Sequence, residues 1–149
     1  MNTQALGLRD NSRMPLERAN GNARSVLVVE DSENSAAMLE IAFLGIPNVA
    51  VLLTESAVEA MRILDSGDAH VNVIVTDLNM PRMDGFELIR RVRADCRLAN
   101  LPIIVVSADT DPTTPSRVAE LGVDAFFPKP FSPAQVRRKL EQLLDGRTP

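Results

Sequence analysis

Short apolar runs rich in valine and isoleucine recur along this chain, and segments with helical periodicity lie between them. Most of the runs are continuous rather than alternating, which is typical of strands covered on both faces in a parallel sheet. The predicted strands are Val26–Val29, Val49–Leu53, Val71–Thr76, Ile103–Ser107 and Ala125–Phe127. Right-handed crossovers would place helices on both faces of such a sheet. The pattern therefore predicts an α/β fold, (βα)5, with a doubly wound five-stranded parallel sheet.

The segments between the strands carry the apolar faces and end signals of helices. The predicted helices are Ser35–Leu44, Ala57–Leu64, Gly85–Arg93, Pro115–Leu121 and a last helix that starts after Ser132. Gly45 is expected to cap the end of the first helix. Asp84 and Glu87 have the spacing of a capping box at the third. The fourth helix is expected to be short because two prolines lie near its start, with Thr114 as its cap.

Length and composition fit one globular domain with a sizeable core, since the chain has 149 residues, of which 45% are hydrophobic. The first part of the chain is polar and shows no sustained period. We expect residues 1–23 to form a flexible N-terminal arm, residues 24–146 the domain, and residues 147–149 a tail.

Charge and apolar patterning exclude several classes of function. The net charge of −4 argues against direct nucleic-acid binding. No apolar run approaches the ~18 residues that span a bilayer, and the N-terminus lacks a secretory apolar region, so membrane insertion is not expected. The single cysteine, Cys96, cannot form an internal disulfide, which favours a cytoplasmic location. The single histidine, His70, is expected to lie at the surface and to take no part in phosphoryl transfer.

Carboxylates follow two of the predicted strands. Glu30 and Asp31 end the first strand, and Asp77 ends the third. These strands are neighbours in a doubly wound sheet, so the three groups should meet at its carboxyl-terminal edge. Two unit charges 4 Å apart repel by about 4 kcal/mol at an effective dielectric of about 20. Such a cluster takes up protons or binds a cation, and ligands that are all oxygen favour Mg²⁺ over zinc. One carboxylate could then act as a nucleophile towards phosphorus.

Two other polar residues are expected at the same edge. Lys129 ends the fifth strand, and its ammonium would pair with a carboxylate or a phosphoryl oxygen. Ser107 ends the fourth strand, and its hydroxyl could donate to a phosphoryl oxygen. Pro130 follows Lys129 directly, and a cis bond between them would turn the chain sharply and aim the lysine; we treat that isomer as a hypothesis.

With these residues in place, the chain resembles the receiver domains of two-component response regulators, in particular single-domain ones like the chemotaxis regulators. The resemblance covers roughly Arg24 to Leu144. It rests on four elements in order: Glu30-Asp31, then Asp77 through Gly85 in the pattern D-x-x-M-P-x-M-D-G, then Ser107-Ala108, then Lys129-Pro130-Phe131. Each element alone is weak, whereas all four on a (βα)5 frame are specific. The resemblance implies the flavodoxin-like version of the fold.

The resemblance also implies roles for the metal ligands. Asp77 would accept a phosphoryl group from a histidine kinase or a histidine phosphotransfer protein. Asp31 and Asp77 would bind Mg²⁺, or Mn²⁺ in its place, through their side chains. Asn79 would bind the ion through its backbone carbonyl, and Glu30 through a water molecule.

The phosphoryl oxygens would be held by Ser107 and Lys129, with help from the backbone N–H groups of Asn79 and Ala108. In this family the serine or threonine moves towards the phosphate while an aromatic residue on the fifth strand turns inward. That aromatic aligns with Phe126, three residues before Lys129. Tyrosine is frequent at this position in the family, whereas the phenylalanine of this chain can fill the same space but cannot make the hydroxyl contact.

The leading hypothesis is a single-domain response regulator that switches a protein-binding surface towards an unidentified downstream protein and is not an enzyme in the ordinary sense. One alternative is a haloacid-dehalogenase-type phosphatase, although the position two after Asp77 is Asn79 rather than a second aspartate. Another alternative is a binding module of receiver shape that works without phosphorylation. A receiver cut from a longer chain is a related alternative.

Overall fold

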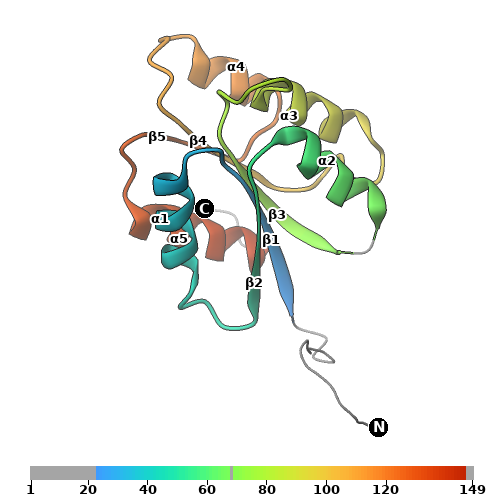
Figure 1. The fold of residues 1–149 in the computed structure, drawn as a ribbon, viewed down its shortest axis with the longest axis vertical. Coiled ribbons are helices and arrows are strands. Elements are labelled where there is room, and N and C mark those ends of the chain that lie inside the picture. The colour runs from blue at the N-terminus through green and yellow to red at the C-terminus, as the bar shows by residue number, and fades with distance from the viewer. Residues whose placement is uncertain (1–22, 68, 147–149) are drawn as a thin grey trace, which may run out of the picture.

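The computed structural model describes residues 23–67 and 69–146 of the chain. It shows one five-stranded parallel sheet in the order β2-β1-β3-β4-β5, with helices on both faces (Figure 1). The strands are β1 (Arg24–Val29), β2 (Val49–Thr54), β3 (Val71–Thr76), β4 (Ile103–Ser107) and β5 (Ala125–Pro128). The helices are α1 (Glu33–Phe43), α2 (Ala57–Ser66), α3 (Gly85–Ala94), α4 (Thr114–Glu120) and α5 (Pro133–Leu144). The predicted (βα)5 fold is therefore confirmed.

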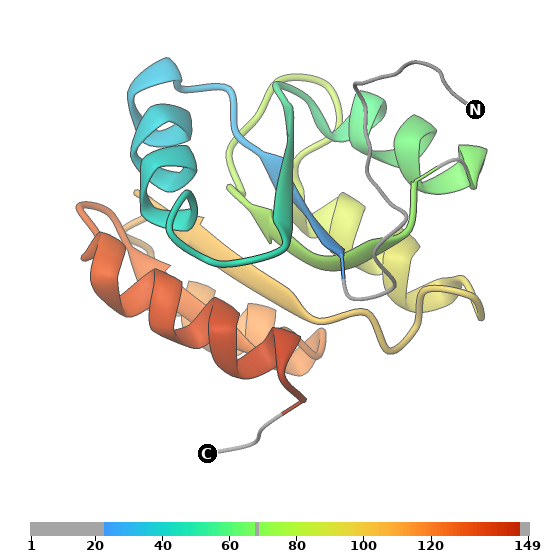
Figure 2. The same ribbon diagram turned by 90° about the horizontal axis from the view of Figure 1, so that it is seen from below.

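The core consists of two apolar layers, one on each face of the sheet. Along β1 the side chains alternate, so Leu27 and Val29 pack on the side of α2, α3 and α4, while Val26 and Val28 pack on the side of α1 and α5. All four are fully buried. Figure 2 shows the sheet from its end, with α1 and α5 grouped on one side. Burial on both faces explains why the strands are continuous apolar runs and not alternating ones.

Four of the five helices begin at a side-chain cap. The hydroxyls of Ser32, Ser56 and Ser132 and the carboxylate of Asp84 each accept a hydrogen bond from the backbone N–H three residues later. Asp84 thus forms the predicted half of the capping box, while the Glu87 carboxylate pairs instead with two arginines of the next turn of α3.

Two predicted details of the helix ends are wrong. Gly45 does not cap α1, because its backbone lies outside the left-handed region; Leu44 is the C-cap in a right-handed conformation, and Asn48 is the residue with positive φ in the turn to β2. Thr114 is the first residue of α4 and not its cap. The N-cap of α4 is Thr113, whose hydroxyl bonds to Asp111 rather than to the helix.

Two regions of the prediction stay untested. The expected arm, residues 1–23, and the expected tail, residues 147–149, lie outside the described residues apart from Ala23. Among the described residues, no helix is both long and apolar enough to cross a membrane.

Candidate functional site

The β1 and β3 strands bring the predicted acidic residues to one edge of the sheet. The Asp77 N–H donates to Val29 O at 3.0 Å, which sets the two strand ends side by side. The Glu30 N–H donates to Thr54 O at 3.0 Å and ties the same edge to β2. As a result, one carboxylate oxygen each from Glu30, Asp31 and Asp77 lies within 4.8 Å of the others.

The three carboxylates differ in burial. Glu30 is 1% exposed and Asp77 is 6% exposed, whereas Asp31 is open to solvent. The cluster therefore has a buried floor and one accessible side, which is the geometry that a ligand arriving from solvent needs.

Lys129 reaches into the cluster from the end of β5. Its Nζ lies 2.9 Å from Glu30 Oε1 and 3.1 Å from Asp77 Oδ2. The Lys129 N–H donates to Ser107 O at 2.8 Å, and the Lys129–Pro130 peptide bond is cis, as the sequence hypothesis held. The lysine thus bridges two of the three carboxylates.

This arrangement shifts the pKa values of the buried pair. Burial raises the pKa of the Glu30 carboxyl above its usual value of 4.5, although the hydrogen bonds from Lys129 and from the Ser32 N–H act in the opposite direction. Burial alone would lower the pKa of Lys129, but its hydrogen bonds to Glu30 and Asp77 outweigh that effect and raise it. Three carboxylates against one ammonium leave a local excess of negative charge.

Short backbone contacts fix the Asp77 side chain. Its Oδ1 accepts hydrogen bonds from the N–H groups of Leu78 at 2.6 Å and Asn79 at 3.4 Å. The Thr76 hydroxyl donates to Asp77 O at 2.7 Å. A Cβ at Gly85 would lie 2.2 Å from Asp77 O, so only glycine allows α3 to start this close to the aspartate.

Sequence reasoning did not assign a role to Gly85 or Thr76 in this site. For Gly85 a signal was present, because glycine at the first position of a helix has low helix propensity and needs another reason to be there. A threonine at the end of a strand carries no comparable signal.

The remaining predicted residues lie around the cluster but do not enter it. The Ser107 side chain is buried, and its Oγ accepts a hydrogen bond from the Asp109 N–H at 3.0 Å. Asn79 and Ala108 are exposed beside Asp77 and Ser107. Phe126 is half-buried on β5, opposite Val105 of β4, and packs against the apolar layer under α2, α3 and α4.

The donor set fits a hard divalent cation. Carboxylate oxygens are the ligands that such ions prefer, and oxygens on opposite sides of one Mg²⁺ ion lie about 4.2 Å apart. The oxygens of Glu30, Asp31 and Asp77, within 4.8 Å of one another, need only small side-chain shifts to match this spacing. The cluster could therefore hold a divalent metal ion.

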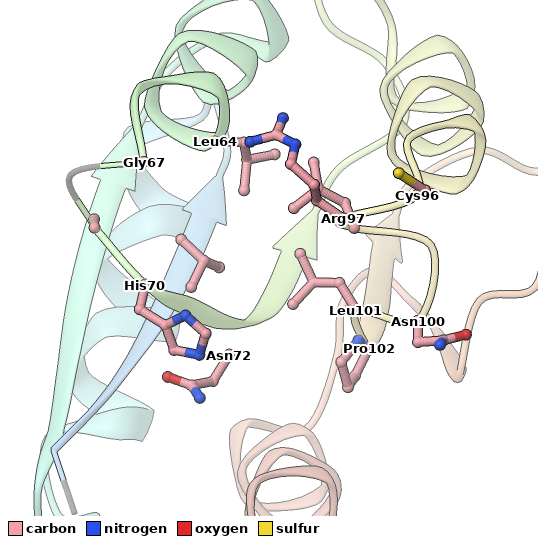
Figure 3. Close-up of a pocket in the computed structure, with 12 residues that line it drawn as sticks. Leu64, Gly67, His70, Asn72, Cys96, Arg97, Asn100, Leu101 and Pro102 are labelled. Carbon is pink, nitrogen blue, oxygen red and sulfur yellow. The ribbon is translucent and has the colours of Figure 1, made fainter. Parts of the chain in front are cut away.

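A hollow of about 460 Å³ lies at the other end of the strands. Figure 3 shows His70 and Asn72 on one side of it and Leu101 and Pro102 on the other. Among the residues that the structure describes, no aspartate or glutamate lines it. His70 is exposed here, as predicted, and so is Cys96.

Comparisons with known proteins agree with the geometry. The family model of the response regulator receiver domain matches residues 26–141. The chain is 34% identical to the chemotaxis protein CheY1 of Helicobacter pylori over 119 residues, which are 80% of this chain and 95% of that protein. It is 33% identical over 119 residues to the two-component response regulator ORR11 of Oryza sativa subsp. indica, which covers 80% of each.

Solved structures show the same fold. The signal receiver domain of a signal transduction histidine kinase from Syntrophus aciditrophicus has a TM-score of 0.74 at 30% identity, covering 85% of this chain and 96% of that one. Receiver domains are signalling phospho-acceptors and not classical enzymes. The chain belongs to the response regulator receiver domain family, and it is a phospho-accepting receiver of two-component signalling.

Proposed function

We propose that Asp77 is the phospho-acceptor of this receiver, within a domain that comprises residues 24–146. The observation that carries the proposal is the placement of Asp77 between Lys129 and the backbone N–H groups of Leu78 and Asn79, beside two further carboxylates. This placement holds the carboxylate in one orientation while its neighbours supply sites for a cation.

The donor in this proposal is the phosphohistidine of a histidine kinase or a phosphotransfer protein. A carboxylate oxygen of Asp77 forms a bond to phosphorus, and the bond from phosphorus to the imidazole nitrogen breaks, with its electron pair leaving on nitrogen. The Lys129 ammonium, already 3.1 Å from Asp77 Oδ2, would follow the charge onto a phosphoryl oxygen. The Asn79 and Ala108 N–H groups and the Ser107 hydroxyl would donate to the other oxygens.

Mg²⁺ is the metal that we propose for the acidic cluster, with Mn²⁺ as a substitute. Asp31 and Asp77 would bind it by their side chains, Asn79 by its backbone carbonyl, and Glu30 through water. When bound, the ion would neutralise charge between the cluster and the incoming phosphoryl group. Glu30 is buried and bonded to Lys129, which supports an indirect role for it.

The output in this proposal is a changed protein-binding surface. A phosphoryl group adds roughly −1.5 to −2 charges at the sheet edge. Ser107 would then exchange its bond from the Asp109 N–H for one to the phosphoryl group, and Phe126 would turn into the space that this opens. A downstream protein that binds one of the two states would read the change. We place these events in the cytoplasm, where the exposed Cys96 thiol would stay reduced.

Phosphorylation by a small phosphodonor tests the assignment. Wild-type protein incubated with acetyl phosphate and Mg²⁺ should gain one phosphoryl group by intact mass spectrometry, and Asp77→Asn should gain none. Asp84→Asn is the matched control, because it removes a carboxylate seven residues away while asparagine still caps α3. Normal labelling of Asp77→Asn would move the acceptor to another residue.

A further inference from the structure

The outer face of α1 carries an apolar stripe. Met38, Ile41 and Leu44 are 39%, 68% and 74% exposed, and they are three of the four large hydrophobic residues that stand out as exposed among the described residues. They are spaced three residues apart, so they share one side of the helix. A contiguous exposed apolar stripe on a small domain indicates a surface that another segment covers.

The charges around the stripe are acidic. α1 contains Glu33 and Glu40 and no basic residue. The guanidinium of Arg137 on α5 lies near the end of α1, next to Gly45, and it is paired with Glu141 at 3.7 Å. A segment that covers the stripe should therefore combine apolar and basic side chains.

The chain itself contains such a segment close by. β1 begins beside the turn that follows α1, because the Arg24 N–H donates to Asn48 O at 2.9 Å (Figure 1). Ala23, at which the preceding 22 residues join the domain, therefore lies beside the turn at Asn48, four residues after Leu44, the most exposed residue of the stripe. Within them, Met14 and Leu16 lie between Arg13 and Arg18, and Glu17 is the one acidic residue of that stretch, which leaves it with a net charge of +1.

We propose that the N-terminal segment folds back onto α1 of the same chain, with Met14 and Leu16 covering the Met38–Ile41–Leu44 stripe and with Arg13 and Arg18 facing Glu33 and Glu40.

The reach is sufficient. Seven Cα-to-Cα steps join Leu16 to Ala23 and span up to about 23 Å, whereas the stripe is about 9 Å long. Such a short tether gives an effective concentration in the millimolar range, so weak contacts suffice for docking. In an extended chain, residues two apart project to the same side, which lets Met14 and Leu16 face α1 together. Pro15 favours this extended form for Met14.

This inference stands apart from the identity of the phospho-acceptor.

Paramagnetic relaxation in the full chain tests the proposal. A nitroxide is attached to Ser12→Cys in a Cys96→Ser background, and amide intensities are measured on nitrogen-15-labelled protein. Docking predicts at least a twofold loss of intensity for amides 38–44 compared with the exposed amides of α2. Adding Ile41→Ser and Leu44→Ser, which replace exposed residues, should restore those intensities while the rest of the spectrum stays unchanged.

A matched pair of variants in the segment identifies the contact. Met14→Ser with Leu16→Ser should restore the α1 intensities, and Leu6→Ser with Leu8→Ser should leave the broadening in place. Equal broadening over α1 and α2 would overturn the proposal. So would broadening that persists in the Met14→Ser, Leu16→Ser variant and disappears in the Leu6→Ser, Leu8→Ser variant. Broadening of a label-free nitrogen-15 sample by added spin-labelled protein would assign the stripe to a second copy and would overturn it as well.

Discussion

The two ends of the β-sheet both carry charged side chains, but these side chains have different partners. At the carboxyl-terminal end, three carboxylates face one lysine, and the buried Glu30 has a raised pKa. At the amino-terminal end, Arg93 donates to the carbonyl oxygens of Ala99, Leu101 and Gly122, and Asp124 accepts from the Ile103 N–H.

This difference indicates that one end of the sheet serves ligand binding and the other serves stability. The amino-terminal end pairs its partly exposed polar groups mainly with the backbone, so it joins α3, β4 and the turn before β5. The carboxyl-terminal end leaves negative charge in excess, which a cation or an incoming ligand can relieve. Substitutions at the amino-terminal end should therefore alter the free energy of unfolding. Substitutions at the carboxyl-terminal end should alter ligand binding, unless they also disturb the backbone there.

Gly85→Ala should have the largest effect, because it disturbs the backbone of the acidic end. The new Cβ would lie 2.2 Å from Asp77 O and 2.7 Å from Leu78 Cα. We expect a loss of about 3 kcal/mol in the free energy of unfolding by urea titration, together with slower phosphorylation. Gly45→Ala is the control, because its Cβ would meet the movable end of the Arg137 side chain and should change stability by less than about 1 kcal/mol. Equal losses of stability in Gly85→Ala and Gly45→Ala would mean that the close approach of α3 to the Asp77 backbone does not require glycine.

Arg93→Met should lower stability by about 2 kcal/mol and leave ligand binding intact. The Arg93 side chain is 20% exposed, and the loss of its guanidinium leaves three carbonyl oxygens without this donor. Arg91→Met, which removes a surface pair with Glu87, should change stability by less than about 0.5 kcal/mol. Calorimetry should give the same Mg²⁺ affinity for all three proteins. A tenfold weaker affinity in folded Arg93→Met would show that the two ends are coupled.

Asp31→Asn should have the opposite profile. Removing one of three carboxylates takes away a ligand of the metal site that we propose, so we expect Mg²⁺ affinity to fall by about tenfold, or ~1.4 kcal/mol. Stability without metal should stay equal or rise, because repulsion in the cluster decreases. Glu33→Gln, an exposed change two residues later, controls for net charge. Unchanged affinity in Asp31→Asn would remove Asp31 from the metal site.

The smallest effect is a pH dependence from Glu30. Burial raises the pKa of Glu30 in the folded state above its usual value of 4.5. The contribution of protonated Glu30 to the free energy of unfolding is therefore fully present below pH 4.5, and it is lost as the pH rises through the folded-state pKa. Lys129, with its pKa raised above 10.5, stays charged throughout this range. In metal-free buffer, the stability of wild type relative to Glu30→Gln should therefore fall as the pH rises from below 4.5 through the folded-state pKa of Glu30. A flat or rising difference in urea midpoint would contradict the raised pKa.

Much of the fold could be predicted because the relevant signals are local. Strand β3, for example, is a continuous apolar run, and its predicted bounds match the structure. The first residue of α4 was harder to predict, because Thr113 and Thr114 are equivalent in sequence. Packing decides that Thr114 is buried as the first residue of the helix and that Thr113 is the N-cap. The prediction that Gly45 caps α1 was wrong for a similar reason, since Asn48 and not Gly45 is the residue with positive φ in the turn to β2.

The acidic cluster depends on both levels. Local patterning was enough to predict that Glu30, Asp31, Asp77 and Lys129 lie at the ends of strands, since apolar runs stop just before them. Their unequal environments could be seen only in the folded domain: Glu30 is buried against Lys129, Asp31 remains in solvent, and Gly85 leaves room behind Asp77. The physical reason is that a strand end follows from local patterning, whereas burial and hydrogen-bond partners depend on segments up to 99 residues away.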